Sequence, residues 1–172
     1  MKNYSIIGFN TLTTLLFILV LHGVRYIIKI INLNRRMKML GDKAGTLTLK
    51  ETSKPIASGR YGLPAMETHN VGSGKLVGHD VMGRATFTAA MRPDGSWVGE
   101  CPAGIIACSE GVATFICNGV GNMTEDGGVS FRGGASFETT SDALSELNGK
   151  YYMFTYDSDA DGNAEWNLYP CK

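Results

Sequence analysis

Four oxygen-bearing side chains near the C-terminus of the 172-residue chain have the spacing of a metal-binding loop. Asp157, Asp159, Asp161 and Asn163 follow one another at every second position, as the ligands of a calcium loop do. The twelfth position of such a loop carries a bidentate glutamate, and here it is Leu168. Two interpretations stay open. One is a plain acidic hairpin turn, which the missing glutamate favours, and the other is a calcium-binding module.

Cysteine thiols are the second set of reactive groups. Cys101, Cys108, Cys117 and Cys171 lack the CxxC pairs of zinc knuckles, so a zinc site is disfavoured. In a reducing compartment all four are expected to be free thiols. In an oxidising space, Cys101 could instead form a disulfide with Cys108 or Cys117 on a neighbouring strand.

The remaining ionisable residues show no recognised catalytic spacing. Most are expected to be solvated surface groups, and no catalytic residue can be assigned. If the domain has a polar ligand-binding cavity, Glu100 and Arg132 are the first candidates to line it, because both lie on expected strands. The sequence therefore leans against an enzyme without excluding one.

Composition limits the partners. Sixteen basic and sixteen acidic residues cancel, so the chain lacks the basic field that binds phosphate backbones, and nucleic acid is not expected as a partner. Twenty-two glycines exceed the usual share of roughly 7% and favour tight turns. No cofactor is indicated apart from the calcium alternative.

The N-terminal segment from Ile6 to Val24 has nineteen residues without a formal charge, about the length of a membrane-spanning helix. A cleaved signal peptide is the rival interpretation. It is disfavoured because bulky and basic residues, rather than a small-residue cleavage site, follow the apolar run. The sequence predicts a single-pass membrane protein with the lipid bilayer as a partner.

A basic amphipathic extension is expected to follow this helix, so that residues 1–40 form one unit. Arg25, Lys29 and Arg36 fall on one helical stripe, which could contact anionic lipid or be covered by other subunits of a membrane complex. Lipid contact is the favoured alternative. Because positive charge gathers on the C-terminal side of the span, the positive-inside rule places the rest of the chain in the cytoplasm.

Residues 41–66 are expected to be a linker. This segment holds two prolines and several glycines, and only Thr46 to Leu49 alternate like a possible short strand. The folded domain is therefore expected to span residues 67–172, beginning near Glu67.

Three copies of a Gly-x-Ala-(Thr/Ser)-Phe motif indicate equivalent strands in that domain, at 83–87, 111–115 and 133–137. Strict alternation from Val129 to Glu138 gives one apolar and one polar face. Glycine turns are expected near residues 95, 127, 149 and 162, and a short helical turn at 141–147. The strands are expected at 67–77, 80–92, 96–103, 110–121, 128–139, 150–157 and 163–170.

Seven strands, or eight with residues 46–52, favour closure into an antiparallel β-barrel, because a barrel removes sheet edges and buries the apolar face. The fold class is mainly β. Residues 72–100 and 111–169 resemble a group of small uncharacterised prokaryotic proteins that look like calycin-type or allene-oxide-cyclase-type barrels. The resemblance covers about residues 67–170. It implies a lumen able to hold an apolar small molecule.

Three functions follow as hypotheses. The first is a non-enzymatic, membrane-anchored barrel that serves as an accessory subunit or binds a small apolar ligand. The second is an isomerase or cyclase for a lipid-derived substrate, and the third is the calcium-binding module. A lumen filled with aromatic side chains would favour the first, and a deep cavity lined by several titratable groups the second.

Overall fold

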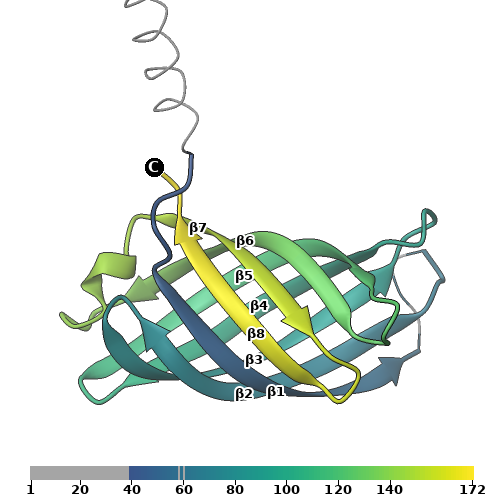
Figure 1. The fold of residues 1–172 in the computed structure, drawn as a ribbon, viewed down its shortest axis with the longest axis horizontal. Helices are drawn as coiled ribbons and strands as arrows, with labels where there is room; N and C mark the ends of the chain where they lie inside the picture. The colour runs from purple at the N-terminus through teal and green to yellow at the C-terminus, as the bar shows by residue number, and fades with distance from the viewer. Residues whose placement is uncertain (1–38, 58, 60) are drawn as a thin grey trace, which may run out of the picture. The chain divides into compact units, whose positions relative to one another are not determined.

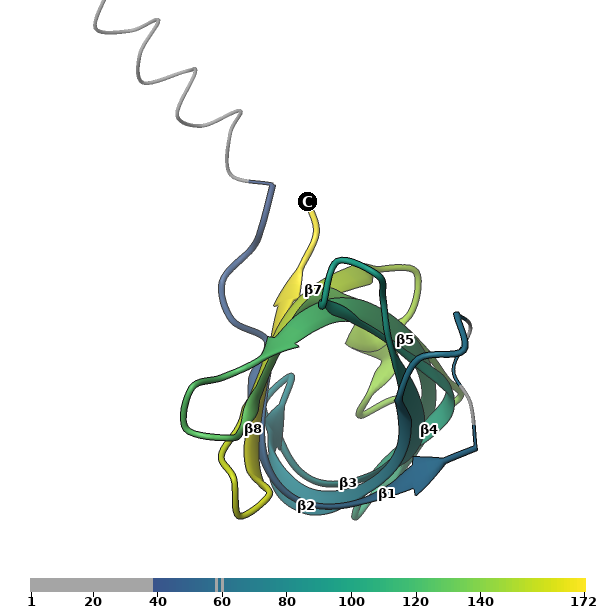
Figure 2. The same ribbon diagram turned by 90° about the vertical axis from the view of Figure 1, so that its right-hand side faces the viewer.

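The computed structural model of the chain describes residues 39–57, 59 and 61–172. Eight antiparallel strands run through this part, each paired with the next along the chain and the last paired with the first. The sheet thereby closes into a barrel (Figures 1 and 2). The strands are β1 (Gly45–Ile56), β2 (Ala65–Leu76), β3 (His79–Met91), β4 (Trp97–Cys108), β5 (Gly111–Met123), β6 (Val129–Thr139), β7 (Tyr151–Ser158) and β8 (Asn163–Pro170).

The transmembrane helix expected at residues 6–24 lies outside the described residues. The same holds for Arg25, Lys29 and Arg36 and for their expected contact with anionic lipid. Among the residues that are described, no helix is long and apolar enough to cross a membrane.

The repeated Gly-x-Ala-(Thr/Ser)-Phe motif carries its phenylalanine into the barrel. Phe115 and Phe137 are buried, and Phe87 packs against the same core. Along β6, Phe131 is buried whereas its neighbour Arg132 is exposed. The period of two that the sequence predicts is confirmed, and it directs an apolar face into the lumen.

Residues 41–66 differ from the expected linker, because they contain a complete barrel strand. β1 pairs with β2 over its whole length, but with β8 only from Gly45 to Lys50. Pro55 falls in the half that has a single neighbour, where a residue without an N–H group is tolerated. The eight-stranded alternative is therefore the observed one, and the barrel begins at Gly45 instead of Glu67.

β4 is also longer than predicted. The sequence analysis expected this strand to end at residue 103. The register of β4 against β5 shifts between Cys101 and Gly104, so a bulge removes Pro102 from the ladder. Beyond the bulge, the strand continues to Cys108.

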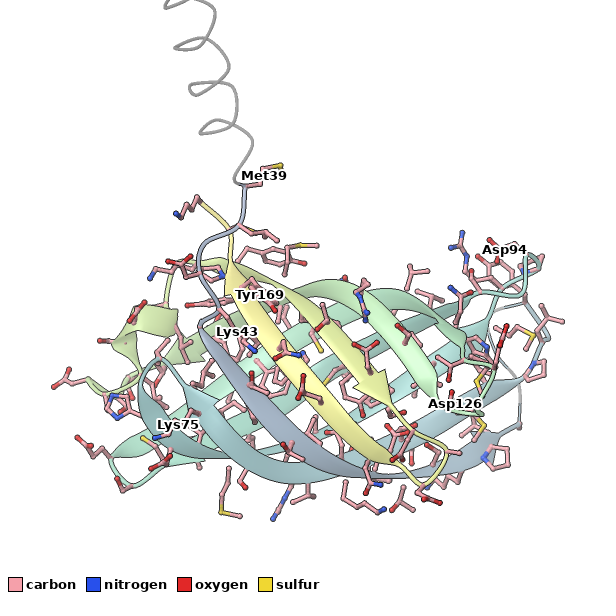
Figure 3. The ribbon with its side chains drawn as sticks, viewed as in Figure 1. Met39, Lys43, Lys75, Asp94, Asp126 and Tyr169 are labelled. Carbon is pink, nitrogen blue, oxygen red and sulfur yellow. The ribbon has the colours of Figure 1, made fainter. Side chains whose placement is uncertain are left out.

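The four predicted glycine turns are confirmed by positive φ angles, of 84° at Gly95, 85° at Gly127, 69° at Gly149 and 78° at Gly162. In an antiparallel meander, alternate connections lie at the same end of the barrel. We call the end with the β1–β2, β3–β4, β5–β6 and β7–β8 connections the mouth, and the other the closed end. Figure 3 labels Asp94 and Asp126 in two mouth turns.

Candidate functional site

Aromatic side chains fill the middle of the barrel. Trp166 lies with its ring centroid 5.1 Å from Phe115 and 6.1 Å from Phe154. Phe137 is 5.5 Å from Phe115 and meets Tyr152 edge to face at 5.3 Å. These distances and the tilted or edge-on orientations are those of favourable aromatic pairs. The lumen is thus a packed core along most of its length.

The closed end is sealed by the segment between β6 and β7. A 3₁₀ turn, η1 (Ser145–Leu147), forms within the range where a helical turn was expected. Leu144 and Leu147 are fully buried and belong to the barrel core. They act as an apolar plug.

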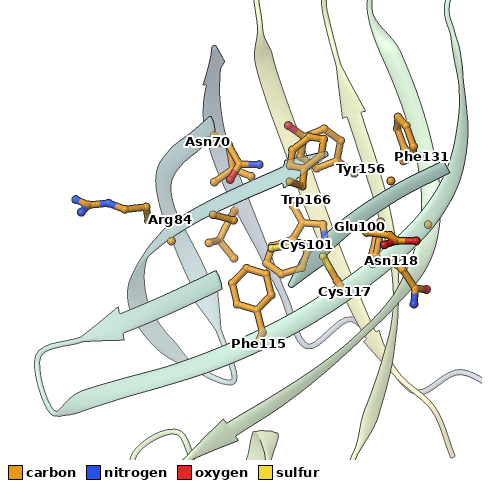
Figure 4. A pocket seen from close by; sticks show the side chains of 18 of the residues that line it. Asn70, Arg84, Glu100, Cys101, Phe115, Cys117, Asn118, Phe131, Tyr156 and Trp166 are labelled. Atoms are coloured by element: carbon orange, nitrogen blue, oxygen red, sulfur yellow. The ribbon is translucent and has the colours of Figure 1, made fainter. Parts of the chain in front are cut away.

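A small cavity of about 60 Å³ remains among the aromatic rings (Figure 4). Leu49, Cys101, Phe115 and Trp166 are among the residues around it. Pockets for drug-sized ligands measure roughly 300–1,000 Å³, so this space can take only molecules close to water in size.

The mouth holds a larger hollow of about 300 Å³. Apolar side chains line part of it, including Met66, Phe87, Trp97 and Phe131. The turns at Gly127–Gly128 and Asp159–Gly162 form its rim. Phe87 and Phe131 border both this hollow and the small cavity, so these two rings separate the mouth from the lumen. The volume suits a small organic molecule.

A polar wall runs down one side of the mouth. The Glu51 carboxylate accepts hydrogen bonds from the Tyr156 hydroxyl and from Ser158 Oγ, the latter at 3.0 Å. Asn70, which is buried, donates to the Tyr156 hydroxyl, and burial together with the Glu51 charge raises the pKa of Tyr156. The Glu51 carboxylate is therefore held in one place by neutral donors.

The Trp97 side chain borders the mouth and carries a buried hydrogen-bond donor that is unused. The side chain lines the hollow and is only 9% exposed. Its Nε1–H has no hydrogen-bond partner within the described part of the chain. A buried donor without a partner costs about 1–3 kcal/mol, and an acceptor on a bound molecule would recover that cost.

Charge at the mouth is acidic. Glu51, Asp159 and Asp161 border the hollow. Hydrogen bonds from the Asn163 side chain and backbone lower the pKa of Asp159, so this carboxylate stays ionised at neutral pH. The Lys50 ammonium group is bonded to the Asp161 carbonyl and to the Asn163 side chain, at 2.8 and 3.0 Å. The mouth consequently disfavours anions.

Glu100 and Arg132, the residues predicted to line a polar cavity, are both exposed. Arg132 points outwards from β6 and forms an ion pair with Asp157 of β7 at 2.8 Å. Glu100 of β4 borders the small cavity, but it is on the exposed side of its strand. Its register partner on β5, Asn118, is exposed as well. The structure places neither side chain in the mouth.

The predicted calcium loop forms the hairpin turn between β7 and β8. Asp157 accepts from Arg132 and from Ser130, and Asp159 accepts from the backbone and side chain of Asn163. In the described residues no three His, Cys, Asp or Glu side chains gather as a metal site. The oxygens of this segment serve the turn and its flanking strands.

Two of the four cysteines meet inside the barrel. Cys101 of β4 is the register partner of Cys117 of β5, and both line the small cavity. Cys108 lies at the closed end of β4, and Cys171 follows β8. All four are thiols in the structure.

Sequence reasoning missed the polar wall and Trp97. Glu51 lies in the segment interpreted as a linker, although Leu47, Leu49 and Glu51 alternate at every second position and so share one face of a strand. Continuing that alternation would have placed Glu51 inside. Trp97 could not be identified from the sequence, because only the folded structure shows that its indole N–H has no hydrogen-bond partner among the described residues.

The barrel is similar to solved structures of bacterial proteins. A protein of unknown function from Clostridium acetobutylicum aligns with a TM-score of 0.65 and 13% identity, over 76% of this chain and 97% of that one. A conserved protein of unknown function from Rhodopseudomonas palustris gives 0.63 and 13%, over 77% and 97%. A beta-barrel like protein from Acinetobacter baumannii gives 0.64 and 9%, over 77% and 95%.

No protein-family model matches the chain, and no curated protein sequence matches it. At these identities the similarity concerns the fold alone. The chain shares its closed eight-stranded antiparallel barrel with uncharacterised prokaryotic proteins.

Proposed function

We propose that the barrel is a non-enzymatic binding domain, which holds a small molecule at its mouth. The ligand has an apolar body and a hydrogen-bond acceptor, and it is neutral or cationic. The N-terminal segment tethers the domain to a membrane, with the barrel on the cytoplasmic side. There it serves as a binder or as an accessory subunit of a membrane complex.

The observation that carries this proposal is the unpartnered Trp97 donor in a hollow of about 300 Å³. Apolar walls with a few fixed polar groups are typical of ligand pockets. Trp97 supplies a donor, and the Glu51 carboxylate on the polar wall supplies an acceptor. A ligand that satisfies Trp97 and covers the neighbouring Phe87 and Met66 side chains gains both hydrogen-bond and apolar contact energy.

Binding is favoured over catalysis because the deep part of the lumen is closed to substrates. Its cavity of about 60 Å³ is bordered mostly by apolar side chains. An isomerase or cyclase needs a deep pocket with several titratable groups around the substrate. The calycin-type resemblance adds the expectation of an apolar ligand, which enters only as far as the Phe87 and Phe131 rings.

Binding can be tested with two neutral probes that differ in one group. 2-Acetylnaphthalene has a carbonyl acceptor, and 2-ethylnaphthalene has the same aromatic body without one. Equilibrium dialysis would use the full chain in lipid nanodiscs, with empty nanodiscs as the blank. We expect saturable binding of both probes and tighter binding of the ketone.

The Trp97→Phe variant keeps the aromatic ring and removes the donor. It should weaken ketone binding by roughly 3- to 10-fold, the equivalent of one hydrogen bond of about 0.5–1.5 kcal/mol. Binding of 2-ethylnaphthalene should not change. Met82→Ala alters an exposed side chain on the outer face of β3 and serves as the control. If neither probe binds saturably, the proposed function is wrong.

The membrane tether has separate tests. The full chain should stay in the membrane pellet after carbonate extraction. A reporter fused after Lys172 should be active in the cytoplasm, and activity only outside it would contradict the proposed sidedness. Native co-purification from membranes would show whether the chain travels with a complex, with a lipid or alone.

A further inference from the structure

Cys101 and Cys117 face each other across the β4–β5 ladder on the inner side of the barrel. Paired residues in antiparallel strands have Cα atoms about 4.5–5.5 Å apart, within the 4.4–6.8 Å range usual for disulfides. Figure 4 labels both side chains close together at the small cavity. The fold therefore places two thiols where a disulfide can bridge the strands without a change of register.

The surroundings make the two thiols unequal. Cys101 is only 3% exposed, and hydrogen bonds from the Cys117 thiol and the Ala103 backbone lower its pKa. Ala103 lies in the bulge next to Cys101, and its backbone N–H donates to the Cys101 sulfur. The pKa of Cys117 is raised by the same thiol contact and by burial. The backbone hydrogen bond from Ala103 at the bulge stabilises a thiolate on Cys101, so Cys101 is assigned as the nucleophile and Cys117 as the resolving thiol.

Access to the pair is limited by size. Both sulfurs border the cavity of about 60 Å³, and Phe87 and Phe131 stand between this cavity and the mouth. Hydrogen peroxide is close to water in size and fits such a space. Glutathione disulfide is far too large for it. The cavity thus selects the oxidant.

We infer that Cys101 and Cys117 form a dithiol site that small peroxides oxidise to an intramolecular disulfide. The Cys101 thiolate attacks one oxygen of hydrogen peroxide, the O–O bond breaks, and the products are a Cys101 sulfenic acid and, after proton uptake, water. The Cys117 thiol then attacks the Cys101 sulfur and releases a second water. Two electrons pass from the two thiols to one peroxide.

The site tolerates both states because the bulge beside Cys101 can absorb a small movement of β4. The other two cysteines cannot substitute. Cys108 faces Gly111 at the closed end, and Cys171 lies beyond the end of β8. The dithiol site is independent of the ligand proposed for the mouth, since Phe87 and Phe131 separate the two cysteines from the mouth.

The test is peroxide treatment of the folded full chain, followed by thiol counting after denaturation. The count should fall from four to two, and peptide mapping should find Cys101 linked to Cys117. Glutathione disulfide should leave Cys101 and Cys117 as thiols in the folded protein within the same time. Cys108→Ser should form the same disulfide, so that variant is the matched control.

A second variant identifies the order of attack. In Cys117→Ser, peroxide should leave a Cys101 sulfenic acid that dimedone traps, with no intramolecular disulfide. The wild-type experiment decides the matter even if this variant does not fold. Four remaining thiols after peroxide, or a disulfide to Cys108 or Cys171, would overturn the inference. Equal oxidation of Cys101 and Cys117 by peroxide and by glutathione disulfide would overturn the size selection.

Discussion

Replacing Tyr156 by phenylalanine removes one hydroxyl from the polar wall and keeps the buried ring. That hydroxyl donates to the Glu51 carboxylate and accepts from Asn70. A hydrogen bond to a charged group contributes about 1.5–3 kcal/mol, and the truncation also leaves the Asn70 donor without this partner. We expect Y156F to lower the free energy of unfolding by roughly 2–3 kcal/mol.

Tyr152→Phe is the matched control in the same lumen. Tyr152 is fully buried, but its hydroxyl reaches only the Glu146 backbone oxygen at 3.4 Å, a weak hydrogen bond. Its loss should cost less than about 1 kcal/mol. Urea unfolding at pH 7, followed by tryptophan fluorescence, would give both values.

A double-mutant cycle with Glu51→Gln isolates the interaction of Tyr156 with Glu51. The coupling energy should account for a large part of the Y156F effect, because the donor acts on the charged form of Glu51. Equal destabilisation by Y156F and Y152F, or a coupling energy near zero, would refute the polar wall as described.

Three further outcomes follow. Calcium at millimolar concentration should leave the melting temperature unchanged, since the Asp157 carboxylate is engaged by Arg132 and Ser130 and the Asp159 carboxylate by Asn163. A rise with calcium would restore the metal hypothesis. Burial alone would raise the pKa of Asp157, but hydrogen bonds from Arg132 and Ser130 outweigh it and lower that pKa. The stabilisation is therefore present above the unfolded-state pKa and lost as the pH falls through the folded-state value, and Arg132→Met should raise the Asp157 pKa in a carboxyl NMR titration. A Cβ at Gly133 would collide with the Asn118 carbonyl oxygen and the Phe154 ring, so Gly133→Ala should destabilise the barrel by several kcal/mol, about 2–4 in urea unfolding.

Local patterns were sufficient for most of the barrel. Alternation along β6 and the glycine turns identified the strands and their inner faces, because both depend on neighbouring residues only. Two expectations were wrong, the linker at 41–66 and the end of a strand at residue 103. The prolines of residues 41–66 were taken as signs of a linker, whereas Pro55 falls where β1 has a single neighbour, and the expected strand at 96–103 missed the continuation of β4 beyond its bulge. Whether a strand can contain a proline or a bulge depends on which strands lie beside it. This pairing cannot be read from the sequence.

The candidate site was beyond the reach of local patterns. Its walls come from six separate parts of the chain, near residues 51, 66, 87, 97, 128 and 160, and these meet only because β8 closes on β1. Arg132 illustrates the limit. It lies on the polar side of an alternating strand, and in a barrel with a packed lumen that side faces outwards. The Cys101–Cys117 pairing likewise required the register that the bulge sets.

The central claim is that a ligand at the mouth accepts a hydrogen bond from Trp97. The chain has two tryptophans, so selective ¹⁵N labelling gives two indole N–H signals, and Trp166 in the lumen acts as an internal control. Titration with 2-acetylnaphthalene should shift the Trp97 signal downfield and leave Trp166 in place, and 2-ethylnaphthalene should produce a much smaller Trp97 shift. The account would be contradicted if the ketone bound and shifted only the Trp166 signal. Binding that shifted neither indole signal would contradict it as well.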